Sequence, residues 1–296
     1  MADPFDFPEA FKSTNEASLA GQRWFIQSTR VQLMLLIIAS AAGSLSWSLD
    51  GDRDGTALLA GVAFSTAALV RLLILRSRPH RAWYDGRAAA ESIKTLAWKH
   101  AVGGDPFVAG DESADRRLVG LVRDVVTSFD TLGPATSAAS AEPTATMRSL
   151  RTTSLEERKR AYSKDRIGDQ NGWYARKAEW NQKRARFWGG MVLLLQVTGA
   201  VGAFLKGFGV LDIDIFGLAG AAIASAAAWL ETKQHHTVAR AYKVAAEELS
   251  DVEALIGEQH TEEAWAGFVA GAEEAISREH TMWKASSRSR EPLSLA

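Results

Sequence analysis

Four long stretches of the chain are almost free of charged side chains, and they fall into two pairs. The first pair covers residues 31–49 and 56–75, and the second covers residues 187–205 and 213–230. A helix rises about 1.5 Å per residue, so about 20 residues cross the hydrocarbon layer of a bilayer. Helices of a soluble bundle carry a polar stripe at helical period, whereas these stretches are apolar all round. The pattern predicts an all-α membrane protein with two tandem transmembrane helical hairpins, four spans in all.

The charges that flank the spans predict their orientation. The turn inside each pair is acidic, with Asp50, Asp52 and Asp54 in the first and Asp212 and Asp214 in the second. The other ends of the spans are basic, and their charges include Arg23, Arg30, Arg76, Arg78, Arg81, Arg87, Arg176, Lys177, Lys183, Arg184, Arg186, Lys233, Arg240 and Lys243. By the positive-inside rule, we expect both termini and the helical extensions of the spans to be cytoplasmic. Residues 1–20 have no apolar segment of the kind a cleaved signal peptide needs.

Aromatic residues and an internal repeat support the hairpin interpretation. Trp47, Trp188 and Trp229 lie at the ends of spans, where interfacial tryptophans are enriched. Trp24 and Trp180 lie 156 positions apart, and the same offset relates several further pairs. These pairs are Arg30 with Arg186, Gly43 with Gly199, Leu49 with Leu205, Gly61 with Gly217, His80 with His236, and residues 89–91 with 245–247. Both copies then have the same orientation, which argues against an inverted-repeat transporter.

The repeat divides the chain into two domains and a connection. We expect a first domain at 1–130, a flexible linker rich in Ala, Ser, Thr and Pro at 131–153, a second domain at 154–284, and a disordered tail at 285–296. Pro79 should break the helix after the second span. Two amphipathic helices are predicted outside the spans, one with a stripe at Leu118, Leu121, Val122, Val125, Val126 and Phe129, and one over 261–284 with Trp265, Phe268, Val269, Ala272 and Ile276 on one face.

Composition excludes several kinds of chemistry. Lys and Arg number 34 against 35 Asp and Glu, so the chain has no basic excess for nucleic acid, and its 0 cysteines exclude disulfides, thiolate metal sites and cysteine nucleophiles. The Gly103-Gly104-Asp105-Pro106-Phe107 segment lacks the Gly-Lys-Ser/Thr of a phosphate loop and predicts a helix stop. His235 and His236 point about 100° apart on a helix, which does not suit a shared metal. We therefore expect no enzyme, no cofactor and no metal site.

Polar and small residues inside the spans are the first group of candidate functional residues. Arg71 is the only charge within a span and either extends to the interface or has a pore role. Gln196 lies in the middle of the third span, where a buried amide needs an interhelical partner. Small residues that let helices approach closely, either within the chain or between chains, include Gly61, Ser65, Gly217, Gly220 and Ala224.

Residues next to the spans resemble a known family. In the first copy these are Trp83, Gly86, Arg87, Ala90 to Trp98 and Asp105 to Phe107, and in the second copy Tyr162, Arg166, Ile167, Asp169, Gln170, Trp173, Tyr174, Lys177, Ala178 and Asn181. They are similar to the SLATT superfamily, two-transmembrane effector domains associated with SMODS nucleotidyltransferases and SLOG sensors in bacterial conflict systems. The candidate cytoplasmic motif is Trp83, Glu91, Trp98, Trp173, Tyr174, His236 and Glu247. Glu91 and Glu247 are equally well read as members of ordinary surface ion pairs.

The resemblance implies a pore-forming or membrane-perturbing antiphage effector of the bacterial inner membrane. It implies contact with membrane lipid, a homo-oligomer, and activation by a sensor or a nucleotidyltransferase-linked signal, without nucleic acid as a partner. Two hairpins and the lack of a fused sensor distinguish this chain from the simplest members. The alternative is a non-conducting membrane scaffold that recruits a cytoplasmic partner. A transporter or channel subunit is a third interpretation, disfavoured because the spans are unbroken and mostly apolar.

Overall fold

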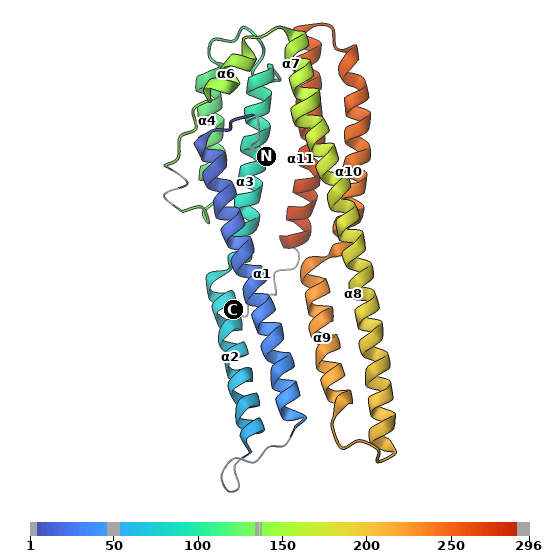
Figure 1. Ribbon diagram of the computed structural model, residues 1–296. Helices are drawn as coiled ribbons and strands as arrows, with labels where there is room; N and C mark the ends of the chain where they lie inside the picture. The colour runs from blue at the N-terminus through green and yellow to red at the C-terminus, as the bar shows by residue number, and fades with distance from the viewer. Residues whose placement is uncertain (1–4, 46–53, 134–135, 137, 289–296) are drawn as a thin grey trace. The chain divides into compact units, whose positions relative to one another are not determined.

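The described residues of the chain form mainly helices, joined by turns and loops. A computed structural model describes residues 5–45, 54–133, 136 and 138–288, without the side chains of 278–288. Four of its helices are long and apolar enough to cross a membrane (Figure 1). The predicted all-α membrane architecture with two hairpins is confirmed. The chain divides into two compact units, which we call the span unit (Arg23–Pro79 and Glu179–Ala239) and the core unit (Met1–Gln22, His80–Ala178 and Arg240–Ala296).

The span unit is built from two antiparallel hairpins (Figure 1). Its helices are parts of α1 (Glu9–Gly43) and α8 (Asp169–Gly207), together with α2 (Gly55–Ser77) and α9 (Ile215–Lys233). The first predicted span ends early because α1 stops at Gly43, and residues 46–53, with Trp47, Asp50 and Asp52, lie outside the described residues. The acidic residues that precede α2 and α9 act as N-caps: Asp54 accepts hydrogen bonds from the N–H groups of Thr56 and Ala57, and Asp214 from that of Gly217.

The second span helix of each hairpin, α2 or α9, is followed by a residue in the left-handed backbone conformation. Arg78 follows α2 with φ of 44°, and Gln234 follows α9 with φ of 48°. Each donates its backbone N–H to a carbonyl four residues earlier, at 3.0 Å from Arg78 to Ile74 and 2.7 Å from Gln234 to Leu230. The next helices, α3 (Pro79–Val102) and α10 (His235–Leu255), begin immediately afterwards. The two left-handed residues lie 156 positions apart, so the repeat is preserved residue by residue, and the predicted helix break at Pro79 is confirmed.

The core unit contains most of the remaining helices. Besides α3, α10 and the ends of α1 and α8, it holds α4 (Ala114–Thr127), α6 (Ala145–Arg151), α7 (Leu155–Ala161), a π-helix η1 (Tyr162–Gly168), a 3₁₀ turn η2 (Ile256–Glu258) and α11 (Glu262–Arg288). The two predicted amphipathic helices are present as α4 and α11, and their apolar faces are buried at Leu118, Val122, Val126, Trp265, Val269, Ala272 and Ile276.

Both copies of the repeat contribute to a shared hydrophobic core in the core unit. Phe5 stacks on Trp98 of the first copy, with ring centres 4.0 Å apart. Tyr162 of the second copy meets Trp98 edge to face at 6.1 Å and Trp265 at 5.6 Å. All four side chains belong to the same buried cluster. The two copies therefore fold here as a single structure, because neither copy surrounds these aromatic rings by itself.

The segment expected to be a flexible linker, 131–153, is packed in its described part. It contains α6, whose N-cap is Thr144, and Met147 is fully buried. The backbone N–H of Ala10 donates to the carbonyl of Ser140 at 2.9 Å, and the Thr144 hydroxyl donates to the carbonyl of Asp6 at 2.8 Å. Small residues give this segment no apolar period, yet they allow its backbone to pack closely on the start of the chain. These described residues of the expected linker are therefore packed against the start of the chain.

Part of the predicted disordered tail is helical. Helix α11 continues to Arg288, past residue 284 where the second domain was expected to end. Residues 289–296, the rest of the predicted tail, lie outside the described residues.

Candidate functional site

Two glycines bring the helices of the second hairpin together. An added Cβ at Gly199 would lie 3.0 Å from the Cβ of Ala219, and one at Gly202 would lie 2.7 Å from the Cβ of Ile215. Helices can approach this closely only where one side contributes no side chain. The small residues that hold α8 against α9 are thus Gly199, which sequence analysis had named only as a member of the repeat, and Gly202, which it had not named.

The small and polar residues predicted for helix packing lie mostly on the outside of the span unit. Those with exposed side chains or positions are Gly61, Ser65, Arg71, Gln196, Gly220 and Ala224, and Gly217 is half-buried. An added Cβ would meet nothing within 4 Å at Gly61 or Gly220. Within the first hairpin the buried residues of α2 are instead Thr56, Ala63, Ala67 and Ile74. The expected partner of Gln196 within the chain is not found among the described residues, because the amide faces outward.

Aromatic and basic side chains connect the two hairpins near the ends of their spans. The guanidinium carbon of Arg30, on α1, lies 4.9 Å from the ring centre of Trp229, on α9. Lys233 lies over the same ring at 5.3 Å, and Trp188 lies 6.4 Å from it. Cation–π contacts of this kind stabilise a charge next to an apolar surface. Trp229, predicted as an interfacial residue, therefore also contacts the first hairpin through Arg30, and Trp188 packs near it within the second hairpin.

Of the two adjacent histidines, His235 is packed and His236 is exposed. The Nδ1 atom of His235 lies 2.7 Å from Oδ1 of Asn181, and its ring meets the ring of Trp180 edge to face at 5.5 Å. Trp180 and Asn181 are on the helix leading into the third span, so His235 fastens the start of α10 to α8. No group of three or more metal-ligating side chains is present in the described part of the chain.

The described contacts of the candidate cytoplasmic motif are packing contacts, a backbone hydrogen bond and ion pairs. Trp98 and Tyr174 are buried in the core, and Trp173 meets Tyr242 edge to face at 5.2 Å. The carbonyl of Trp83 accepts a hydrogen bond from Ser18 at 3.0 Å. Glu91 pairs with Arg87 at 2.9 Å, and the exposed Glu247 with Lys243 at 3.7 Å, each one helical turn away. The two carboxylates thus form the ordinary ion pairs that sequence analysis had offered as one interpretation.

A buried ion pair, which sequence analysis did not predict, lies inside the core unit within the second copy, and Thr95 of the first copy also contacts it. Glu273 of α11 accepts hydrogen bonds from Arg166 of η1 at both of its oxygens, from Nε at 2.8 Å and from Nη2 at 2.6 Å. Tyr162 also donates to Glu273, at 3.0 Å, and so does Thr95 of α3, at 2.8 Å. Arg166 and Glu273 are 1% and 0% exposed, so both charges depend on each other for solvation.

The surroundings of this pair fix its protonation. Burial alone would lower the pKa of Arg166, but the charge and hydrogen bonds of Glu273 raise it above its usual value. Burial, followed by the charge of Glu273, raises the pKa of Tyr162 well above its usual value. The arginine stays charged and the tyrosine stays neutral over the physiological range. We therefore interpret the cluster as a structural ion pair with its hydrogen bonds, and not as a proton-transfer site.

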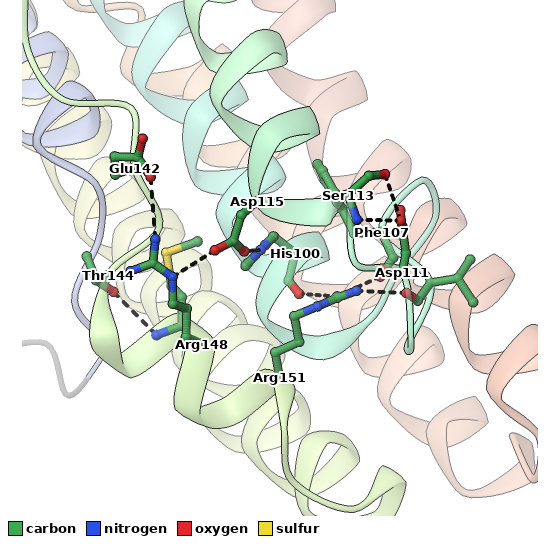
Figure 2. A network of polar contacts seen from close by, with 11 residues as sticks. His100, Phe107, Asp111, Ser113, Asp115, Glu142, Thr144, Arg148 and Arg151 are labelled. Carbon is green, nitrogen blue, oxygen red and sulfur yellow. Dashed lines mark hydrogen bonds and ion pairs between the residues drawn. The ribbon is translucent and has the colours of Figure 1, made fainter.

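A second polar network connects α3, α4 and α6 (Figure 2). His100 is fully buried, and its Nε2 atom lies 2.7 Å from Oδ1 of Asp115. The other carboxylate oxygen of Asp115 accepts a hydrogen bond from Nε of Arg148 at 2.8 Å. Burial lowers the pKa of His100, against the opposing hydrogen bond of Asp115. Burial would raise the pKa of Asp115, but its hydrogen bonds with Arg148 and His100 outweigh this and lower it. The Nδ1 atom of His100 is buried without a hydrogen-bond partner in the described structure.

Arg151 of α6 and Arg158 of α7 cap the carboxyl end of α3. Arg151 donates to the carbonyls of His100, Phe107 and Val108 at 2.9, 2.7 and 2.7 Å (Figure 2). Arg158 donates to the carbonyl of Val102 at 2.8 Å and pairs with Glu262 of α11. Positive charge stabilises the negative end of a helix dipole. Gly103, with φ of 78°, ends the helix as its sequence predicted.

The sequence contains a signal that indicates a buried ion pair at Glu273. Glu273 lies four residues after Val269 and three before Ile276, so it falls on the apolar face of the predicted 261–284 helix. A carboxylate in that place must be paired when the face is buried. The network around His100 had no such signal, because its members come from three elements whose packing no local pattern specifies.

Comparison with known proteins gives the family. Residues 8–159 match the SMODS and SLOG-associating 2TM effector domain 3, and residues 162–283 match the SMODS and SLOG-associating 2TM effector domain 1. No curated protein and no solved structure matches the chain. The first match extends through 131–153, in keeping with the packing of α6, and the second begins at the π-helix. The chain therefore belongs to the SLATT family of membrane effector domains and carries two of them in tandem.

Proposed function

We propose that the chain is an inner-membrane effector of a bacterial conflict system, which oligomerises and permeabilises the membrane when triggered. Effector domains of this family are associated with such systems, and the four apolar helices provide the membrane part. The basic flanks of the spans support cytoplasmic termini and a cytoplasmic core unit. Membrane lipid and further copies of the chain are the proposed partners, and a sensor or nucleotidyltransferase-linked signal is the proposed trigger.

The outward position of Gln196 is the observation that carries this proposal. Its side chain is exposed in the middle of an apolar span and has no hydrogen-bond partner among the described residues. An amide in hydrocarbon is costly unless it finds a polar partner or water. Contact between copies supplies the partner, and an opened pore supplies the water. The exposed small residues Gly61, Ser65, Gly220 and Ala224 would allow a neighbouring copy to approach closely.

The two left-handed residues of the repeat would transmit a conformational change from the core unit to the spans. Arg78 and Gln234 each stand between a span helix and the helix that leads into the core unit. A non-glycine residue in this conformation costs about 1 kcal/mol or more, and such strain collects at switch regions. A change in the core unit would then tilt both hairpins together through equivalent joints.

The test is permeabilisation by the full chain in cells and in vesicles. Overexpression should collapse the membrane potential, and the purified chain should release dye from vesicles. Gln196→Leu and Gly220→Leu should each reduce release several-fold, while the neighbouring exposed apolar change Val197→Leu should leave it intact. An unchanged membrane potential on overexpression, with the neighbouring genes present, would overturn the proposal.

The scaffold interpretation keeps one specific observation in its favour. The core unit has its own aromatic core and two buried polar networks, and so could present a defined surface to a cytoplasmic partner whether or not the spans conduct. In that case the spans would be replaceable by unrelated membrane anchors without loss of activity. An effector that permeabilises the membrane would lose its activity in the same exchange.

A further inference from the structure

A groove in the core unit lies beside α7 and the π-helix η1. Its volume is about 620 Å³, and it is lined by Glu156, Lys159, Arg160, Ser163, Lys164 and His260, together with the η2 turn. Small-molecule sites typically enclose about 300–1,000 Å³. This groove is open to solvent, so a ligand there would be held mainly by charge and hydrogen bonds.

Positive charge is concentrated in this groove, although the chain as a whole carries a net charge of -1. Three permanent cations and one histidine face a single lining carboxylate, that of Glu156. The hydrogen bond from Lys159 is the main cause that lowers the pKa of Glu156, and the charges of Arg160 and His260 lower it further. Lys159, Arg160 and His260 therefore all act on one carboxylate, and Lys164 lines the same groove.

Lys159 is held rigidly at the wall of the groove. Its side chain is 7% exposed, and its Nζ atom lies 2.9 Å from Oε1 of Glu156 and 3.0 Å from the carbonyl oxygen of Gln259. These contacts use two of the three N–H groups of an ammonium. A fixed cation with one donor to spare is pre-organised for an anion and loses little side-chain entropy when it binds one.

Arg160 and Lys164 are the adaptable members of the groove. Both are exposed, and neither forms an ion pair with any described residue. Like charges on neighbouring turns of a helix repel each other, so an anion between them relieves the repulsion. Lys164 projects from η1, whose backbone is fixed by the buried pair of Arg166 with Glu273. π-Helical turns are frequent at functional sites, where they reposition side chains.

We propose that this groove binds a soluble oligophosphate, a small anion with several negative charges. Arginine and lysine form their strongest hydrogen bonds with phosphate oxygens, and three cations around one groove match a chain of phosphates better than a single carboxylate. Gly257 also lines the groove, and an added Cβ there would meet nothing within 4 Å. The proposal concerns binding alone and does not depend on whether the spans conduct.

The experiment measures binding of inorganic tripolyphosphate to the full chain in neutral detergent, by calorimetry at low ionic strength. The parent chain should bind saturably, and the double variant Arg160→Glu/Lys164→Glu should bind about tenfold more weakly or worse. The matched control is Arg116→Glu/Arg123→Glu, which reverses two exposed arginines of α4 outside the groove. The double variant Arg160→Lys/Lys164→Arg keeps the charge and should retain most of the binding.

Three results would overturn the proposal. One is the absence of saturable binding by the parent chain. Another is an equal loss of binding in the α4 control, which would show a response to net charge only. The third comes from lipid nanodiscs with and without anionic lipid: if the groove variants change only the association with anionic lipid, and not tripolyphosphate binding, the ligand is a membrane headgroup. A melting curve like that of the parent chain establishes that the groove variants are folded.

Discussion

Glu273 accepts two hydrogen bonds from the Arg166 guanidinium, from Nε at 2.8 Å and from Nη2 at 2.6 Å. This pair links the last helix of the second SLATT domain to the π-helix that begins the domain. Thr95 of the first domain donates to the same carboxylate at 2.8 Å. The side chains that solvate this buried charge thus come from both domains. The ion pair itself lies within the second domain, and the Thr95 hydrogen bond is the contact that depends on how the two copies pack against each other.

Loss of one member of this pair should destabilise the core unit strongly. Arg166→Met leaves Glu273 buried and unpaired, and we expect a loss of about 3–5 kcal/mol in the free energy of unfolding. The double variant Arg166→Met/Glu273→Leu should cost much less than the sum of the two single changes, since no charge remains unpaired. Chemical unfolding in detergent, followed by tryptophan fluorescence, measures both.

The control for this prediction is the exposed ion pair between Lys243 and Glu247, whose side chains are 75% and 65% exposed. Lys243→Met should cost at most about 1 kcal/mol, because water solvates the carboxylate that remains. Equal effects at the two sites would contradict the role assigned to the buried pair.

Glycine at the left-handed joints should stabilise the chain. Arg78→Gly and Gln234→Gly place the residue that tolerates positive φ at φ values of 44° and 48°. We expect each to raise the free energy of unfolding by about 0.5–1 kcal/mol, measured by thermal unfolding. Arg76→Gly, the same exchange within the last turn of α2, should have the opposite sign and cost about 1 kcal/mol. A loss of stability at both joints would show that the left-handed backbone is not strained.

The sequence predicted the spans, the repeat and both amphipathic helices because each has a local periodic signal. It failed where small residues carry the packing. The stretch around Met147 has no apolar period and was interpreted as a linker, yet its backbone pairs with the start of the chain at Ala10. Gly220 and Gly199 have equivalent local patterns, and only the structure distinguishes the glycine that faces Ala219 from the one that faces outward.

Orientation can be tested directly because the chain contains 0 cysteines. Val210, in the turn of the second hairpin, and Asp124, on α4, are both exposed and can each be replaced by a single cysteine. Val210→Cys should react with a membrane-impermeant maleimide added to intact cells, and Asp124→Cys should react only after permeabilisation. The reverse pattern would place the core unit outside the cytoplasm and contradict the positive-inside prediction.

A large side chain at Gly202 should separate the helices of the second hairpin. The 2.7 Å separation between an added Cβ and Ile215 leaves no room for leucine, and overpacking of this kind costs about 1–3 kcal/mol or more. Gly202→Leu should therefore lower the melting temperature of the chain in detergent. Gly190→Leu, where an added Cβ meets nothing within 4 Å, should leave it nearly unchanged. If both variants melt alike, close packing at Gly202 does not hold α8 against α9.

Acidification should destabilise the core unit through His100. Burial lowers the pKa of this histidine in the folded chain, so the unfolded chain takes up the proton first as the pH falls below about 6.5. The stability that depends on a neutral His100 is complete above that pH and declines below it, by at most about 1.4 kcal/mol per pH unit. His100→Gln cannot titrate, and its amide can still donate to Asp115. Thermal unfolding at pH 7.5 and pH 5 should therefore show a larger drop for the parent chain than for this variant, and equal drops would assign the pH dependence to other groups.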